Sequence, residues 1–284
     1  MRHASDSGRR VPTLRTGALA LMACVLLAAC ASLPTDDGDG LALPDSAWAR
    51  AVHIAGPASP GTWNHLRFGH QKPTRYSPTV HQGRPALLAR SDAGNSTLRM
   101  ALAAQDVAAA PWLSFSWFVP ALNERADLRE ADIDDAVVRV ILAFEGDRSR
   151  MAARDHMLSE IVQLVTGEPL PYATLMYVWD HRYPVGSVIP NPHTQRIRKL
   201  VVESGPRRLN QWVDMERDID ADYRQVFGEA PGRLVAIGVM TDSNNTREKV
   251  HAWFGPLTLS AKAALAGPLR AADEGQVIEE AASR

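Results

Sequence analysis

The feature that most constrains the fold is a two-residue alternation of apolar side chains in two stretches near the middle of the chain. In the first stretch the apolar side chains fall at every second position: Leu113, Phe115, Trp117 and Val119. The second stretch repeats the pattern with Ala136, Val138, Val140, Leu142 and Phe144. Successive side chains of a strand point to opposite faces, so this spacing predicts two strands that each turn one face towards a core.

Other strand-like stretches of similar length are separated from one another by turn residues. Further strands are expected at Asn64–Phe68, Ala86–Arg90, Thr97–Leu102, Thr174–Trp179, Arg196–Glu203, Gln211–Arg217, Arg233–Thr241 and Lys249–Leu259. About ten short strands without regular alternation of strand and helix predict an all-β fold, an antiparallel β-sandwich or jelly roll of the galactose-binding or lectin-like kind.

Two stretches interrupt the strand pattern. From Ser149 to Val165 the apolar residues follow a helical period, with Met151, Leu158 and Ile161 among them, which predicts one amphipathic helix inserted between strands. A short helix is expected at Ile219–Phe227.

The amino-terminal residues predict export. Arginines precede the apolar run Gly17–Ala29, which is too short for a stable transmembrane helix and has the form of a secretory signal. The end of this run and the residue after it, Leu27–Cys30, resemble the lipobox of bacterial lipoproteins. In such proteins the signal is cut before the cysteine, which becomes the first residue and carries lipid. An ordinary cleaved signal, with Cys30 incidental, is the alternative. Since Ala31 is not aspartate, the resemblance favours an outer-membrane lipoprotein that faces the periplasm.

These signals divide the chain into four parts: signal peptide 1–29, flexible tether 30–46, β-sandwich domain 47–262 and carboxyl-terminal tail 263–284. Cleavage before Cys30 leaves one cysteine, so neither a disulfide nor thiol chemistry is expected in the domain. It also removes four arginines and one aspartate, which takes the formal net charge from −1 to −4. This mildly acidic domain lacks the basic surface of a nucleic-acid binder, so the expected partner is the membrane, through lipid on Cys30.

Acidic and amide side chains gather at two distant strand ends. Asp132, Asp134 and Asp135 precede one strand, and Asp242, Asn244, Asn245 and Thr246 follow another. If sandwich packing brings the two ends to one rim, the side chains have three possible roles. They hold turns, they supply oxygen ligands to a structural calcium ion, or they bind a ligand directly.

Arg139 lies within a predicted strand, on the face opposite Val138 and Val140. A cation in that position needs an anionic partner, and Asp135, Asp180 or Asp242 is available. The sequence leaves open whether Arg139 makes a structural ion pair or contacts an acidic or hydroxyl-rich ligand.

Aromatic residues in the later strands have two interpretations. They form a stacking platform for sugar rings, or they fill the core. The set is Tyr177, Trp179, Tyr183, Trp212 and Trp253. The histidines are scattered and form no zinc-binding pair, so no metal or other cofactor is assigned beyond the calcium alternative.

Several short motifs resemble a bacterial family catalogued as domain of unknown function 3047. They follow one another from about Trp63 to Ser260, and are Asp134–Val140, Tyr177–Trp179, Asn191–Thr194, Val202–Gly205, Asp222–Arg224, Phe227–Glu229 and Met240–Thr246. The resemblance implies an exported bacterial domain and no established activity. Where the family pattern carries a second aspartate in the last loop, this chain has Asn244, which weakens the case for a metal.

Together these features predict an envelope domain that binds a glycan or another polyhydroxylated ligand at the rim and carries no catalytic residue. The candidate binding residues are Asp134, Asp135, Arg139, Trp179, Asp180, Asn191, Asp242, Asn244, Asn245 and Thr246. One alternative is a glycoside hydrolase or lyase that uses Asp214, Glu216 or Glu203 as acids. The other is a non-catalytic scaffold protein, which a broad exposed apolar patch would favour.

Overall fold

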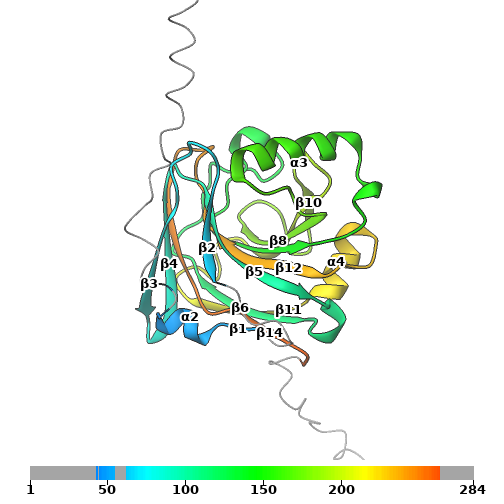
Figure 1. Cartoon of the computed structure of the whole chain (residues 1–284). Coiled ribbons are helices and arrows are strands. Elements are labelled where there is room, and N and C mark those ends of the chain that lie inside the picture. Colours follow the sequence, from blue (N-terminus) through cyan, green and yellow to red (C-terminus); the bar gives the residue numbers. More distant parts are fainter. Residues whose placement is uncertain (1–42, 44, 55–61, 263–284) are drawn as a thin grey trace, which may run out of the picture. The chain divides into compact units, whose positions relative to one another are not determined.

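The fold is a β-sandwich, seen here in a computed structural model that describes residues 43, 45–54 and 62–262. Fourteen strands form two seven-stranded sheets among these residues, with few helices (Figure 1). The predicted sandwich is therefore confirmed. The predicted signal, the lipidated Cys30 and the tail all lie outside the described residues, as does most of the tether.

The first sheet runs in the order β1-β14-β6-β13-β4-β3, and β11 pairs with the other side of β6. Its strands are β1 His53–Ile54, β3 Arg75–His81, β4 Arg84–Asp92, β6 Trp112–Phe118, β11 Trp212–Asp218, β13 Lys249–Phe254 and β14 Thr258–Ser260. We call it sheet A.

The second sheet, sheet B, runs in the order β2-β5-β12-β7-β8-β10-β9. Its strands are β2 Trp63–Arg67, β5 Ser96–Gln105, β7 Arg139–Phe144, β8 Ala173–Asp180, β9 Val188–Pro190, β10 Ile197–Ser204 and β12 Leu234–Met240. Most pairs in both sheets are antiparallel, but β1 pairs in parallel with β14 and β8 in parallel with β10.

The core lies between the sheets and follows the alternation in the sequence. Val140, Leu142 and Phe144 of β7 are fully buried, and so are Leu113 and Trp117 of β6. The intervening residues of β7 therefore point to the outer face of sheet B. This geometry places Arg139 at the outer face, at one end of its strand.

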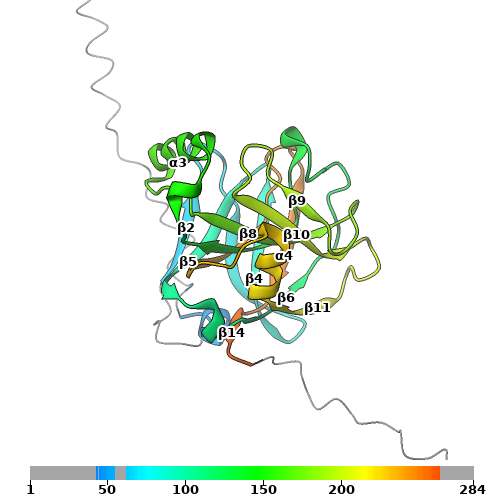
Figure 2. The same cartoon turned by 90° about the vertical axis from the view of Figure 1, so that its right-hand side faces the viewer.

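Helices cover the ends of the sandwich and one part of its surface. The helix α2 Ala47–Ala51 buries Trp48 in the core, where Leu43 also packs. The helix α4 Ile219–Phe227 has the predicted bounds. It lies at the right-hand side of the sandwich in Figure 1, the side that faces the viewer in Figure 2. Its Asp222 accepts hydrogen bonds from Tyr177 of β8 and Arg217 of β11, so α4 ties the two sheets together.

The inserted helix α3 Ala153–Thr166 is present, but its apolar face is not the buried one. Its buried residues are Asp155 and Ser159, whereas Leu164 is 87% exposed. Ile161 and Val165, which the helical period assigned to the packed face, are also exposed. Thr194 and Arg148 explain this orientation, because their side chains donate to Asp155 and Ser159 and so hold the polar side inward. Within the described ranges, no helix is long and apolar enough to cross a membrane.

Candidate functional site

The two acidic corners predicted from the sequence meet at one end of sheet B. The carboxylate of Asp135 accepts from the backbone N–H and the hydroxyl of Thr246, at 2.7 and 2.6 Å. Its other oxygen accepts from the backbone N–H of Asn245 at 3.3 Å. Asp135 and Thr246 are both buried, so in this structure they hold the two loops together and do not face a ligand.

Arg139 completes the junction through a bidentate ion pair. Its Nε donates to Oδ1 of Asp242 and one terminal nitrogen donates to Oδ2, both at 2.9 Å. Oδ1 of Asp242 also accepts from the backbone N–H of Ala136 at 3.0 Å. Both charged side chains are 4% exposed. Of the three acids that the sequence offered to Arg139, the partner is Asp242.

Asp134 joins this pair to a lysine that the sequence did not single out. Its carboxylate accepts from Arg139 at 3.1 Å and from Nζ of Lys199. Nζ of Lys199 donates also to the carbonyl of Leu128 at 2.7 Å, and the side chain is 1% exposed. Two cations and two carboxylates thus lie in one network, which we call the charged quartet: Asp134, Arg139, Lys199 and Asp242.

Burial and charge shift the protonation equilibria of the quartet. Burial alone lowers the pKa of Arg139, but the charges of Asp242 and Asp134 raise it well above its usual value. Burial raises the pKa of Asp242 to about 6, although Arg139 opposes the change. Burial and the charge of Arg139 lower the pKa of Lys199 to about 8, although the charge of Asp134 opposes this change. Arg139, Lys199 and Asp242 are therefore predominantly charged at pH 7. The quartet pairs two cationic side chains with two carboxylates, so its formal charges balance.

The same contacts bear on the calcium alternative. A calcium ion requires six to eight oxygen ligands, whereas the oxygens of Asp135 and Asp242 already accept from N–H and O–H donors. In the part of the chain that the structure describes, no group of three or more histidine, cysteine, aspartate or glutamate side chains is placed to hold a metal ion. The carboxylates act here as acceptors for the protein's own donors.

A pocket of about 350 Å³ opens beside the quartet, and all four of its members line it. Asn191, Asn244 and Asn245 line it as well, so six of the ten predicted binding residues reach it: Asp134, Arg139, Asn191, Asp242, Asn244 and Asn245. Its volume is within the usual range for small-molecule sites.

Two amide oxygens in the wall of this pocket lack a donor. Oδ1 of Asn95 and Oδ1 of Asn244 are buried and accept no hydrogen bond from any described residue. The amide nitrogen of Asn244 donates to Asn245, which leaves the oxygen unpaired. A buried acceptor without a partner costs about 1–3 kcal/mol. Both oxygens are buried, so a ligand that donates a hydrogen bond would recover this free energy at either position only once the amide side chain turned towards the pocket.

An apolar groove of about 220 Å³ continues from the polar pocket across the outer face of sheet B. The two hollows share Asn95, Met176, Ile197 and Met240. The floor of the apolar groove is a cross-strand row in which Gly238 of β12 pairs with Ile141 of β7, and Ile141 pairs with Met176 of β8. Val162 of α3 and the segment 168–171 form one wall. The outer face of sheet B thus carries one continuous depression, polar at one end and apolar at the other.

Two of the predicted binding residues, Trp179 and Asp180, lie away from this depression. Trp179 is 2% exposed, packs against Trp117 and donates its ring N–H to the carbonyl of Gly205, so its ring faces the core. Asp180 accepts from the backbone N–H groups of Arg182 and Tyr183, both at 2.6 Å, and thereby caps a turn. Neither residue lines the polar pocket.

The aromatic set does not form one platform. Tyr177 is fully buried, like Trp179. Trp212 and Trp253 are half-buried in sheet A, where Trp253 stacks on His81 with ring centroids 4.0 Å apart. The core interpretation is therefore correct for the sheet B members, and the sheet A tryptophans lie in a separate cluster.

The three acids proposed for glycoside hydrolysis lie on two different sheets. Asp214 and Glu216 are on β11 of sheet A, and Asp214 pairs with Arg84 at 2.7 Å. Glu203 is on β10 of sheet B, where it pairs with Arg208 at 2.9 Å. Hydrolysis requires two carboxyl groups on either side of one bond, so of the three acids Asp214 and Glu216, at alternate positions on one face of β11, form the pair that the enzyme alternative would use.

Sequence reasoning missed Lys199 and Asn95. Lys199 has the same signal as Arg139, since it is a cation within an apolar strand, at Ile197–Val202. Asn95 has no such signal, because its place in the pocket depends on the turn between β4 and β5 lying beside the loop after β12. The hydrogen bond of 2.8 Å between Ser91 and Ser243 holds these two segments together.

These features define the chain as a β-sandwich domain with a ligand-sized depression on one sheet and a buried charged quartet at its polar end. The family is shown by a family model that matches residues 61–258. The chain belongs to the family described as "Protein of unknown function (DUF3047)". No curated protein matches the chain significantly.

Two solved structures resemble this chain at low TM-scores. One is the xyloglucanase domain of NopAA, a type three effector from Sinorhizobium fredii, in complex with cellobiose. It is 12% identical, with a TM-score of 0.36, over 73% of this chain and 99% of the other. The second is SGBP-B from a complex xyloglucan utilization locus in Bacteroides uniformis. It is 11% identical, with a TM-score of 0.28, over 69% of this chain and 49% of the other. At TM-scores this low, neither similarity locates a binding site on this chain.

Proposed function

We propose that this protein is a non-catalytic envelope domain that binds a glycan or another polyhydroxylated ligand in the depression on sheet B. The observation that carries the proposal is the polar pocket with its two unpaired amide oxygens, on Asn95 and Asn244. Hydroxyl groups donate as well as accept hydrogen bonds, so a polyol satisfies such acceptors where a purely anionic ligand does not.

The charges of the pocket support an uncharged ligand. The charged quartet formally contributes two positive and two negative charges, so it does not attract ions of one sign from a distance. At short range the pocket instead offers the amide side chains of Asn191, Asn244 and Asn245, which line it. This is the pattern that recognises a molecule with several hydroxyl groups.

The apolar groove supports an extended ligand over a single small polyol. Sugar rings present C–H groups on their faces, and these pack on apolar side chains such as Ile141 and Met176. A ligand that reached from the polar pocket into the groove would pass Ile197, which lines both. We therefore expect affinity to rise with oligosaccharide length.

The test is calorimetric titration of the full chain with neutral β-glucan oligosaccharides, from disaccharide to hexasaccharide. We expect binding that strengthens with length and weakens about tenfold in Asn244→Ala, since one polar partner in the pocket is removed. The variant Ile197→Trp, which places an indole at the junction of the two hollows, should abolish binding without lowering the melting temperature.

Gln211→Ala is the matched control, because it truncates an exposed amide side chain beside β11 of sheet A. It should bind like the unmodified chain. Absence of binding to every oligosaccharide, or equal weakening in Asn244→Ala and Gln211→Ala, would rule the proposal out.

The proposal includes attachment to the membrane through lipid on Cys30, since the lipobox-like Leu27–Cys30 supports it. The expected location is the outer membrane, facing the periplasm. Mass spectrometry of the mature protein from a bacterial host should show a diacylglyceryl-modified cysteine as its first residue. In Cys30→Ala the protein should leave the membrane fraction; recovery of an unmodified mature chain would exclude lipidation.

A further inference from the structure

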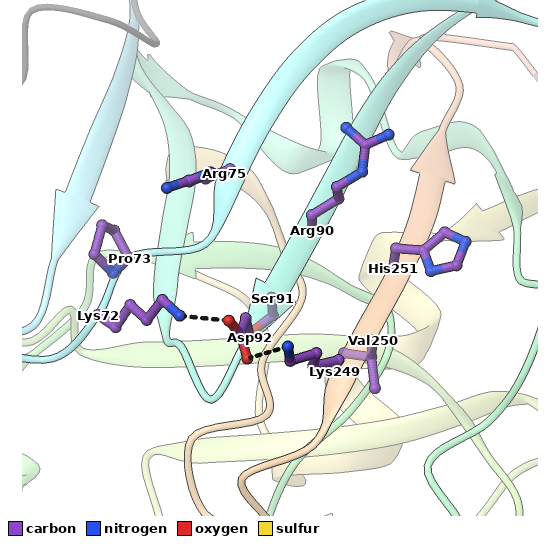
Figure 3. A pocket seen from close by; sticks show the side chains of 9 residues that line it. All are labelled: Lys72, Pro73, Arg75, Arg90, Ser91, Asp92, Lys249, Val250 and His251. Carbon is purple, nitrogen blue, oxygen red and sulfur yellow. Dashed lines mark hydrogen bonds and ion pairs between the residues drawn. The ribbon is translucent and has the colours of Figure 1, made fainter.

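A second hollow, of about 270 Å³, lies on sheet A and is lined mainly by basic side chains. Figure 3 shows Arg75 of β3, Arg90 of β4 and His251 of β13 on neighbouring strands, with Asp92 between Lys72 and Lys249. We call it the basic pocket. It shares no lining residue with the depression on sheet B.

Three of these basic residues stand in one cross-strand row. Arg75 is directly opposite Arg90 in the β3–β4 pair, and His251 is directly opposite Arg90 in the β4–β13 pair. Like charges in directly opposed positions destabilise a sheet. Burial lowers the pKa of His251, and the positive charge of Arg90 lowers it further. His251 is therefore predominantly neutral at pH 7. The like charges in the row are therefore those of Arg75 and Arg90, two exposed side chains on adjacent strands, and a bound anion would reduce the repulsion between them.

The single acid in the pocket is already occupied. Asp92 pairs with Lys72 at 2.6 Å and with Lys249 at 3.8 Å. Among the described residues, the guanidinium groups of Arg75 and Arg90 take part in no ion pair. Four positive charges against one negative charge give the basic pocket a net charge of about +3.

We propose that the basic pocket binds a phosphate group, with Arg75 and Arg90 as its principal ligands. An excess of about three positive charges suits a phosphate monoester or a pyrophosphate better than a lone carboxylate, which neutralises only one of them. Guanidinium groups bind phosphate oxygens in pairs of parallel hydrogen bonds, which lysine does not. The phosphate group has three possible sources: inorganic phosphate or pyrophosphate, a phosphorylated small molecule, and a lipid headgroup. The experiments below distinguish the soluble sources from the lipid.

The first experiment titrates the full chain with inorganic pyrophosphate at low ionic strength, followed by calorimetry. We expect binding that weakens as salt is added, and that falls about tenfold or more in the double variant Arg75→Gln with Arg90→Gln. Asp92→Asn should act in the opposite direction and strengthen binding several-fold, because it removes the one negative charge and releases both lysines.

The matched control is the double variant Arg154→Gln with Arg207→Gln, which makes the same change in net charge at exposed positions outside the basic pocket. Its affinity should stay within about twofold of the unmodified chain. Equal weakening in the two double variants would reduce the effect to general charge attraction and overturn the proposal. The proposal would also be overturned if Asp92→Asn failed to strengthen binding. This variant keeps both arginines, so its result does not depend on whether the variants that lack Arg75 and Arg90 fold correctly.

The second experiment measures sedimentation of the Cys30→Ala chain with vesicles of phosphatidylglycerol and with vesicles of phosphatidylcholine alone. Binding to the anionic vesicles that is lost in the Arg75 and Arg90 double variant identifies a lipid headgroup as the source. Pyrophosphate binding without vesicle binding identifies a soluble phosphate compound. If neither probe binds, the proposal is wrong, and the oligosaccharide titrations of the sheet B depression are unaffected.

Discussion

Replacing Asp242 by asparagine tests whether the charged quartet holds the two loops together. The substitution keeps the shape of the side chain but removes its charge. One of its oxygens becomes an NH₂ group that faces a donor of Arg139, while the other can still accept from Ala136 and from Nε of Arg139. The buried quartet then carries a net positive charge in place of zero.

The magnitude can be worked out from the geometry. Two unit charges about 4 Å apart attract by about 4 kcal/mol at an effective dielectric constant of 20, and removing one partner of a buried pair costs about 3–5 kcal/mol. We expect Asp242→Asn to lose free energy of unfolding in that range. For a domain of this size the loss corresponds to a fall in melting temperature of about 10 °C.

The assay is urea unfolding of the full chain followed by tryptophan fluorescence, with Asp132→Asn as the control. Asp132 is an exposed aspartate in the same segment, so its variant should stay within about 0.5 kcal/mol of the unmodified protein. The double variant Asp242→Asn with Arg139→Met should recover part of the loss, because no buried charge is left facing an amide. A loss below about 1 kcal/mol in Asp242→Asn, or no recovery in the double variant, would refute the structural role of the pair.

Three further predictions concern single residues. Lys199 has a folded-state pKa of about 8 against 10.5 in the unfolded chain. Stability from this group should therefore rise between about pH 8 and pH 10.5, by up to about 3 kcal/mol, and denaturant titrations across this range should show no such rise in Lys199→Met. A β-carbon at Gly232 would lie 2.0 Å from the carbonyl oxygen of Glu145, so Gly232→Ala should lower the free energy of unfolding by about 2 kcal/mol or more. Leu164 is almost fully exposed on α3, so Leu164→Glu should change that free energy by less than about 0.5 kcal/mol; a larger loss would show that the helix packs differently.

Strand positions were predictable where one face of the strand meets the core. The residues Leu113–Val119 and Ala136–Phe144 alternate between apolar and other side chains, and β6 and β7 bury the predicted faces. The strand β3 escaped prediction because Pro78 interrupts it and its buried positions are few. A proline is tolerated there because β3 is at the edge of sheet A, where one side of the strand needs no hydrogen bonds.

The candidate site was predictable only in part. Asp134, Arg139 and Asp242 carry local signals, since charged side chains next to or within apolar strands need partners. The helix α3 shows the limit of such signals. Its apolar period predicted a packed face, yet hydrogen bonds to Asp155 and Ser159, made by residues on other segments, turn the opposite face inward.

By itself, the sequence determined the class of fold, the faces of its longer strands and the presence of charged groups at two strand ends, because these depend on the period of neighbouring side chains. The tertiary structure alone decided that the two ends meet, that Lys199 and Asn95 join them, and that an apolar groove continues from the pocket. The physical reason is distance along the chain. Asp135 and Thr246 are 111 positions apart, and only the order of strands in sheet B places their side chains within hydrogen-bonding distance.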